Sequence, residues 1–167
     1  MILPDAMIER RIIDQMMVEP YNEEQLSPAS YDLALGDSYR VPVSSTDGVW
    51  SEAIRFKKML FMPGCFYLFH SLETVRIPDD LTAMLFMKST YCRKGLEHLH
   101  ACWIDPGFTG QVTFEFTSCW PDPIELEAGE VVAQLVFQQM AAPCRNVYST
   151  VNGHHYQGQT GPTVPWR

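Results

Sequence analysis

Three basic side chains and two aliphatic hydroxyl groups fall within seven consecutive positions of the chain. The cations are Lys88, Arg93 and Lys94, and the hydroxyl groups belong to Ser89 and Thr90. Hydroxyl, backbone N–H and cationic groups in one place suit a phosphate, which accepts several hydrogen bonds and needs its charge neutralised. The alternative is a solvated basic turn. The segment is not a Walker loop, because the chain contains no Gly-x-x-x-x-Gly-Lys-Ser/Thr pattern.

A glutamate in the segment 111–118 is a second candidate, because apolar and polar residues alternate there. The apolar set is Val112, Phe114 and Phe116, and the polar set is Thr113, Glu115 and Thr117. In a β-strand the two sets face opposite sides. If the aromatic set packs into a core, Glu115 stands on a rigid strand and faces a groove. The alternative is a solvated strand residue.

An aspartate, Asp105, precedes Glu115 by ten residues and stands directly before a Pro106-Gly107 turn. Aspartate often begins such turns, because its carboxylate accepts local backbone hydrogen bonds. The functional interpretation is a carboxylate that faces a ligand, with Phe108 close enough to cover a ring.

The metal and hydrolase patterns of the chain are incomplete. His98 and His100 alternate, but two histidines without a third ligand are more typical of a structural role. Zinc-dependent base deaminases need His-x-Glu followed by Pro-Cys-x-x-Cys, and here Pro143-Cys144 lacks the second cysteine. We therefore expect any deamination by this chain to proceed without zinc. A Gly-x-Ser-x-Gly nucleophile elbow is also absent from the sequence.

One helix is predicted near the N-terminus, over residues 5–18. Apolar residues recur every four positions from Ile8 to Met16, and Asp5 stands near the first turn as a cap. Pro20 stops the helix, because proline cannot continue the hydrogen-bonded backbone.

The rest of the chain predicts strands. The segments rich in aromatic and aliphatic residues are 53–61, 65–71, 81–87, 111–118 and 131–139. Proline and glycine separate many of them, which favours a β-sandwich or β-barrel. The tail from Asn152 onward has few aliphatic residues, so we expect a mobile arm over residues 152–167.

Length and composition indicate one domain over residues 1–167. With 12 basic and 20 acidic residues the net charge is −8, which argues against a nucleic-acid partner. Hydrophobic residues make up 46%, enough for a core, yet no apolar run approaches a membrane span. The five cysteines are an odd number without Cys-x-x-Cys, which favours small buried side chains over disulfides. Since no signal peptide is evident, we expect a soluble cytoplasmic protein.

Four segments, in the family's order, resemble the dCTP deaminase family, whose members are relatives of the trimeric dUTPases. Residues 27–36 resemble its Pro-Ala/Ser-Ser-x-Asp-Leu-x-Leu-Gly stretch, and residues 88–93 resemble its Arg-Ser-Ser-x-x-Arg signature. Residues 104–110 resemble Ile-Asp-Pro-Gly-Phe/Trp-x-Gly, which leads to a strand with the catalytic glutamate. Residues 156–163 resemble the C-terminal arm of the family.

This resemblance implies a mainly β, distorted barrel or jelly-roll-like fold of the dUTPase type. It also implies a homotrimer with sites between subunits, and a short N-terminal helix and closing arm fit that fold. The implied reaction is hydrolysis of the cytosine 4-amino group of dCTP to give dUTP and ammonia. Mg²⁺ is expected on the triphosphate, since it prefers hard oxygen ligands and retained water, and no protein metal site or zinc is expected.

The resemblance also assigns roles by position. Glu115 is the general base that activates water, and Ser89 and Arg93 hold the water and the catalytic carboxylate. Lys88, Ser89 and Thr90 face the phosphates, Asp105 holds the sugar or base, and the strand edge from Thr113 to Glu115 reads the pyrimidine. The further residues that the resemblance places at the substrate are Arg93, Phe108, Thr113, Phe114, Gln134, Tyr148, His155, Tyr156 and Gln159.

The chain departs from the family pattern at several positions. Lys88 replaces arginine and keeps the charge without the bidentate fork, and Thr90 replaces serine. His155 replaces a common lysine of the arm, so one phosphate contact is expected to depend on pH.

The segment around the expected base pocket decides the predicted product. Leu99, His100 and Cys102 fit poorly to the Ser/Gln-Thr-Ala-Gly stretch of relatives that form dUMP directly, which favours dUTP as the product. Open alternatives are a bifunctional enzyme that forms dUMP, a deaminase of a 5-modified dCTP, and a non-enzymatic trimeric nucleotide sensor.

Overall fold

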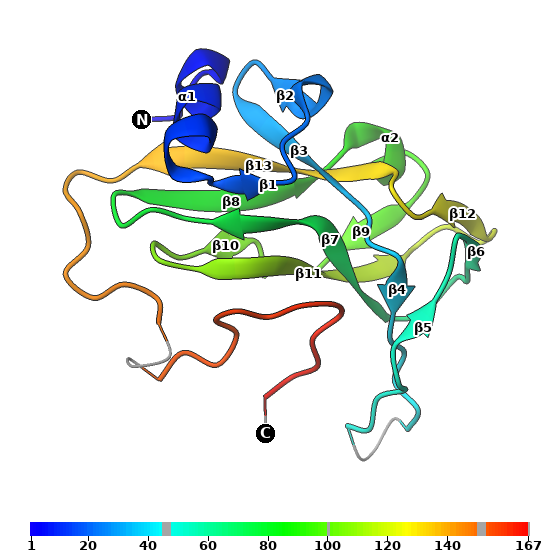
Figure 1. Ribbon diagram of the computed structural model, residues 1–167. Coiled ribbons are helices and arrows are strands. Elements are labelled where there is room, and N and C mark those ends of the chain that lie inside the picture. The colour runs from blue at the N-terminus through cyan, green and yellow to red at the C-terminus, as the bar shows by residue number, and fades with distance from the viewer. Residues whose placement is uncertain (45–47, 100, 150–152, 167) are drawn as a thin grey trace.

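The computed structural model describes residues 1–44, 48–99, 101–149 and 153–166, and strands dominate it (Figure 1). The helices are α1 (Asp5–Gln15), the 3-10 turn η1 (Glu23–Gln25) and α2 (Ser89–Cys92). The strands are β1 (Val18–Glu19), β2 (Leu26–Ser27), β3 (Ser30–Ala34), β4 (Ser38–Tyr39), β5 (Ile54–Arg55), β6 (Lys58–Phe61), β7 (Tyr67–Arg76), β8 (Leu81–Met87), β9 (Leu96–His98), β10 (Trp103–Ile104), β11 (Thr109–Ser118), β12 (Ile124–Glu127) and β13 (Val131–Gln139). Neither α-helix in the described part of the chain is long and apolar enough to cross a membrane.

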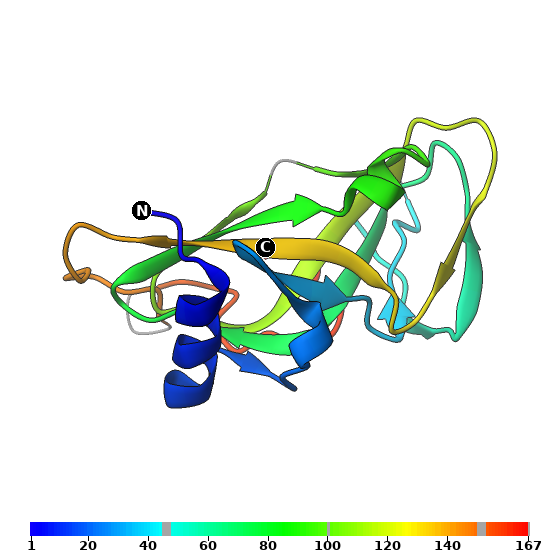
Figure 2. The same ribbon diagram turned by 90° about the horizontal axis from the view of Figure 1, so that it is seen from above.

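Two main sheets pack against each other and enclose the core. One has the order β10-β8-β13-β3-β2 and the other the order β1-β7-β11-β9. Figure 1 shows β13 and β8 above β7 and β11, and Figure 2 shows the same two layers from above. The mainly β expectation is therefore confirmed, with the difference that the sheets stay open and, over the residues described, no barrel closes.

The observed strands agree with the predicted ones to different degrees. The structure has β8 and β13 at the predicted bounds, while β7 runs on to Arg76 and β11 begins two residues early, at Thr109. The predicted strand 53–61 is divided into β5 and β6, because the Phe56 N–H donates to the carbonyl of Asp37 and the chain bends there. We did not predict β3, in which polar Ser30 and Asp32 alternate with apolar Tyr31 and Leu33 but all five residues are buried.

The N-terminal helix is shorter than predicted. It ends at Gln15, not at residue 18, because Met16 has a left-handed backbone with φ of 51°. Val18 then pairs with Val75 of β7 and is 1% exposed, so sheet pairing takes the residues that periodicity had assigned to the helix. Ile8 and Ile12 do form the buried face. The prediction of Asp5 as a cap was wrong, because the N-cap position is Pro4 and no side chain caps it, while the Asp5 carboxylate accepts only from the N–H of the adjacent Ala6.

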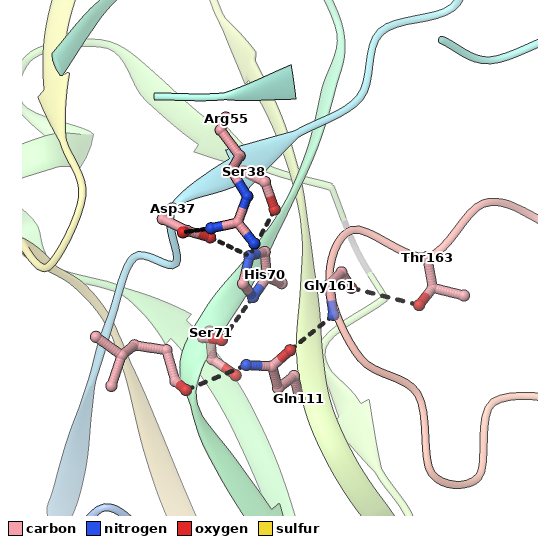
Figure 3. Close-up of polar contacts among 9 residues, drawn as sticks. Asp37, Ser38, Arg55, His70, Ser71, Gln111, Gly161 and Thr163 are labelled. Carbon is pink, nitrogen blue, oxygen red and sulfur yellow. Dashed lines mark hydrogen bonds and ion pairs between the residues drawn. The ribbon is translucent and has the colours of Figure 1, made fainter. Parts of the chain in front are cut away.

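His70 of β7 is buried beside Asp37 and Ser38, which directly follow the segment 27–36 (Figure 3). The His70 Nδ1 lies 2.9 Å from the carbonyl oxygen of Ser71, which can only accept, so this nitrogen carries the proton. The Nε2 then accepts from the Ser38 hydroxyl at 3.0 Å. Burial lowers the pKa of His70 and keeps the ring neutral. A methyl group on Gly36 would come within 2.1 Å of the ring, which explains the glycine that ends the segment 27–36.

We predict that Gly36→Ala lowers the free energy of unfolding by about 2 kcal/mol, because the ring leaves no room for a methyl group. Urea denaturation at one fixed protein concentration measures this loss. Adding His70→Ala should recover part of the lost free energy of unfolding. The double variant should therefore lose less than the sum of the losses of the two single variants. Simple additivity of the two losses would contradict the contact.

Candidate active site

Glu115 lies in a pocket, on the side of β11 that faces away from the core. Val112, Phe114 and Phe116 are buried, so the alternation predicted for this strand is confirmed and Glu115 is half-buried on the opposite side. The pocket has a volume of about 260 Å³. Its lining comprises Trp50, Phe66, Leu68, Ala101, Trp103, Ile104, Asp105, Phe108, Val112, Thr113, Glu115, Tyr148, Tyr156, Gln159, Thr163 and Pro165.

A tight turn between β10 and β11 brings Asp105 and Phe108 to this pocket. The Phe108 N–H donates to the Asp105 carbonyl at 3.2 Å, and the Asp105 carboxylate accepts from the Trp103 indole at 2.9 Å. Gly107 has φ of 90°, and a methyl group there would lie 2.7 Å from Val147. The turn therefore needs glycine both for its backbone and for close packing of the C-terminal segment.

Aromatic rings of the C-terminal segment form one wall. The rings of Phe108 and Tyr148 meet edge to face, with centroids 5.7 Å apart. The Tyr148 hydroxyl accepts from the N–H of Tyr156 at 3.2 Å, and its ring stacks on His154. Such a wall suits a flat ring, because aromatic faces provide large apolar area with restricted geometry. Three residues of this wall, Phe108, Tyr148 and Tyr156, were predicted at the site.

Desolvation shapes the electrostatics around Glu115. Burial raises the pKa of its carboxyl above the ordinary value of 4.5. Burial also raises the pKa of the Cys102 thiol, and the charge of Glu115 raises it further. The two residues lie close together, because the Leu99 N–H donates to the Glu115 carbonyl at 2.9 Å and the Cys102 thiol lies 3.8 Å from the Leu99 carbonyl. A carboxylate with a raised pKa on a rigid strand is suited to accept and return a proton.

The predicted phosphate-binding residues do not join this pocket within the chain. Ser89 and Thr90 lie on α2, which Lys88 precedes and Arg93 follows, and none of residues 88–93 lines the pocket of Glu115. Arg93 and Lys94 line a different hollow, together with Trp120, Pro123, Ile124 and Glu125.

Lys88 and Gln134 belong to a polar cluster on the other sheet. Lys88 forms an ion pair with Asp32 of β3, and the Ser30 hydroxyl donates to the Gln134 side chain at 3.3 Å. Gln134 of β13 pairs with Asp32 of β3. Lys88 and Gln134, which were both predicted to contact the substrate, therefore lie close together and apart from the pocket of Glu115.

Two predicted contacts have side chains directed elsewhere. Phe114 is fully buried and stacks on Phe116, so only its backbone can face a ligand. His155 stacks on Trp166 with centroids 4.4 Å apart, outside the pocket lining. His100, one of the residues on which the predicted product depends, lies outside the described residues.

Several residues that line the pocket were not predicted from the sequence. Trp50 and Phe66 meet edge to face at 5.6 Å and come from segments that carry no ligand-like pattern. Trp103 stands two residues before Asp105, and this nearness to the Asp-Pro-Gly turn was the available signal. Thr163 lies within the arm motif without having been singled out.

The sequence is similar to a known protein family and to named proteins along most of its length. The sequence model of the dCTP deaminase-like family matches residues 2–140. A Tropheryma whipplei protein named "dCTP deaminase, dUMP-forming" is 35% identical, over 98% of this chain and 91% of that protein. A Pyrococcus horikoshii protein named "dCTP deaminase" is 34% identical, over 96% of this chain and 94% of that protein.

Solved structures show the same fold. The 2′-deoxycytidine 5′-triphosphate deaminase of Agrobacterium tumefaciens superposes with a TM-score of 0.70 at 22% identity. The match covers 83% of this chain and 48% of that one, so the chain spans about half the length of this neighbour. A Staphylococcus bacteriophage 80alpha dUTPase superposes with a TM-score of 0.51 at 16% identity, over 77% of this chain and 85% of that one.

We predict that Glu115→Gln accelerates alkylation of Cys102 at neutral pH. Burial keeps the pKa of this thiol high, and removal of the neighbouring negative charge lowers it, which increases the reactive thiolate. Peptide mass spectrometry after timed iodoacetamide treatment measures the rate at Cys102. Glu125→Gln, a change on β12 outside the pocket, serves as the control. An unchanged rate in Glu115→Gln would contradict the proximity of the two groups.

Proposed function

Because the chain belongs to the dCTP deaminase-like family, we propose that it removes the 4-amino group of dCTP by hydrolysis. Its relatives are enzymes named dCTP deaminase, and this chain is an enzyme of that family. The observation that carries the proposal is Glu115, a half-buried carboxylate on a rigid strand inside an aromatic pocket. The products are dUTP and ammonia, and the reaction belongs in the cytoplasm.

Glu115 acts as the proton carrier of this reaction. It accepts a proton from water as the water oxygen bonds to C4, and it delivers that proton to N3 of the ring. It then moves the remaining hydroxyl proton to the 4-amino group. The C4–N4 bond breaks, a carbonyl forms at C4, and ammonia leaves with the carboxylate regenerated. General-base assistance of this kind contributes roughly 10²–10⁴-fold, and the positioned water supplies further acceleration.

The open edge of β11 provides groups that can recognise a pyrimidine. The Gln111 N–H donates to the arm, and the Glu115 carbonyl accepts from the N–H of Leu99. The backbone polar groups of Gln111 and Glu115 therefore point to the same side of β11. Strand alternation turns the N–H and C=O of Thr113 to that side as well, between these two contacts. We assign Thr113 to the base edge, Asp105 to the sugar, and Phe108, Tyr148 and Tyr156 to the apolar wall.

A second copy of the chain completes the site in this proposal. Glu115 and the cationic segment 88–93 lie in separate places on one chain, although the reaction needs both at one nucleotide. An apolar face suited to such assembly is present, because Phe86 and Trp103 are 46% and 57% exposed on the outer side of the same sheet. We propose a homotrimer in which Ser89 and Arg93 of one subunit face Glu115 of the next.

Mg²⁺ enters this proposal as part of the substrate. The triphosphate and water supply the hard oxygen ligands that Mg²⁺ prefers, and the cations near α2 neutralise the remaining charge. We propose that the deamination itself requires no zinc, because water activation is assigned to Glu115. A zinc chelator such as 1,10-phenanthroline should then leave the rate unchanged.

A second candidate function is direct formation of dUMP. The Tropheryma whipplei relative and a Methanosphaera stadtmanae relative, 34% identical, are both named dUMP-forming. Leu99 and Cys102 differ from the Ser/Gln-Thr-Ala-Gly pattern expected for that activity, which favours dUTP as the product. A 5-modified dCTP as substrate, and a nucleotide sensor without turnover, are further outcomes that the same experiment separates.

Product analysis tests the proposal. Purified protein is incubated with dCTP and Mg²⁺, and dCTP, dUTP and dUMP are separated by chromatography with assays for ammonia and pyrophosphate. We expect dUTP and ammonia in equal amounts without pyrophosphate. Glu115→Gln should lose at least about 10²-fold in rate and still bind dCTP. Direct dUMP with pyrophosphate would establish the second candidate, and binding without turnover of dCTP or 5-methyl-dCTP would contradict an enzyme.

We also predict the position of the acid limb of the pH–rate profile. A general base works only when deprotonated, and burial raises the pKa of the Glu115 carboxyl. As pH falls, kcat/KM should therefore decline at a pH above the ordinary glutamate value of 4.5. The pH dependence of kcat/KM for dCTP measures the limb, after a stability check at each pH. A limb at or below 4.5 would contradict the role of a partly desolvated carboxylate.

A further inference from the structure

The C-terminal arm adds to the edge of β11 that β9 leaves open. Strand β9 pairs only with residues 116–118 of β11, whereas the arm contacts residues 109–113. The N–H of Gly158 donates to the Thr109 carbonyl at 2.7 Å, and the N–H of Gln111 donates to the Gln159 carbonyl at 3.0 Å. Figure 1 shows the arm running along β11, on the side away from β8 and β13. The arm is thus held by its own chain through strand-like pairing.

One side chain, that of Gln111, connects the arm to the strand behind it (Figure 3). Its Nε2 donates to the Leu72 carbonyl at 3.2 Å, and its Oε1 accepts from the N–H of Gly161 at 2.6 Å. The first contact determines the second, because an amide whose nitrogen is bound to a carbonyl presents its oxygen at the other end.

A β-bulge accounts for the orientation of Leu72. The pairing of β11 with β7 shifts register between Gln111 and Thr113, and there the Ser71 hydroxyl replaces a backbone acceptor for the N–H of Val112, at 2.8 Å. Bulges of this kind re-aim groups beside functional sites. The bulge thus supplies the acceptor that fixes the amide of Gln111.

The glycine before Gln111 provides independent evidence of close docking. A methyl group on Gly110 would lie 3.0 Å from the Gln159 carbonyl oxygen and 3.1 Å from its nitrogen. These are backbone atoms, which cannot turn aside like the end of a side chain. The last glycine of the segment 104–110 therefore leaves the space that the arm occupies.

We propose that Gln111 is a positioning residue, whose amide holds the C-terminal arm on β11 and so places the arm over the pocket of Glu115. Gln111, Thr113 and Glu115 follow one another on the same side of the strand. The arm follows this side of β11 as far as the pocket. The N–H of Thr163 donates to the Thr113 hydroxyl at 3.4 Å, and Thr163 and Pro165 line the pocket. The effect on catalysis rests on the proposed deaminase function, whereas the docking of the arm does not.

Limited proteolysis without nucleotide tests the docking itself. Chymotrypsin cleaves after Tyr156, and mass spectrometry follows the release of the C-terminal piece. Loss of the hydrogen bond between the Gly161 N–H and the Gln111 side chain in Gln111→Ala should raise the cleavage rate about fivefold, through a larger undocked fraction. Gln111→Met, which keeps the length and loses the polar groups, should match it. Gln111→Glu keeps an acceptor for Gly161 and should fall between them and the wild type.

Thr117→Ala is the matched control, since Thr117 lies on the same side of β11 and donates to the Cys65 carbonyl instead of the arm. Its cleavage rate should equal that of the wild type. Equal rates in the wild type, Gln111→Ala and Gln111→Met, with circular dichroism showing all three folded, would overturn the proposal.

Steady-state kinetics test the consequence for the reaction. With dCTP and Mg²⁺, Gln111→Ala should raise KM about fivefold and change kcat less, because saturating nucleotide draws the arm closed. Faster cleavage together with unchanged KM would overturn the positioning role and leave only docking. If the wild type fails to deaminate dCTP, the cleavage rates still decide whether Gln111 holds the arm.

Discussion

The alternation of β11 is the constraint on which the candidate site depends. Phe114 and Phe116 are fully buried and stack with centroids 5.4 Å apart, so the strand cannot slip by one residue without turning both rings to solvent. Their burial fixes the opposite side, where Gln111, Thr113 and Glu115 follow at intervals of about 7 Å. The core thereby positions a carboxylate, the backbone edge proposed to read the base, and the contact for the arm on one rigid element.

The site is assembled from parts that differ in how they are held. The Asp105 turn is fixed by glycines that allow close packing, and the aromatic wall comes from a C-terminal segment that pairs with β11. The cationic segment around α2 lies elsewhere, with Lys88 already paired to Asp32. One chain thus presents the pocket proposed for a base and sugar, and the groups suited to phosphate stand on another part of its surface. This separation is the physical reason for proposing that subunits share the site.

Much of the fold could be predicted because local patterns and tertiary packing agreed. The alternation in 111–118 identified both the core side and Glu115, and the apolar runs at 81–87 and 131–139 gave two strands at their observed bounds. Prediction failed where tertiary pairing overrode a local pattern, as at Val18, which belongs to a sheet instead of the helix. Trp50 and Gln111 could not be found, because their roles arise from segments that meet only in the folded chain.

A mixed-subunit measurement tests most directly whether neighbouring chains share the site. Glu115→Gln and Arg93→Ala chains carrying different tags are co-expressed, and assemblies that contain both are isolated. If Glu115 and Arg93 of different subunits face one nucleotide, every mixed trimer has one site of three in which both groups are intact, so the isolated mixed assemblies should regain about a third of the wild-type dCTP deaminase activity. Verified mixed assemblies that remain as inactive as either parent would contradict the shared site.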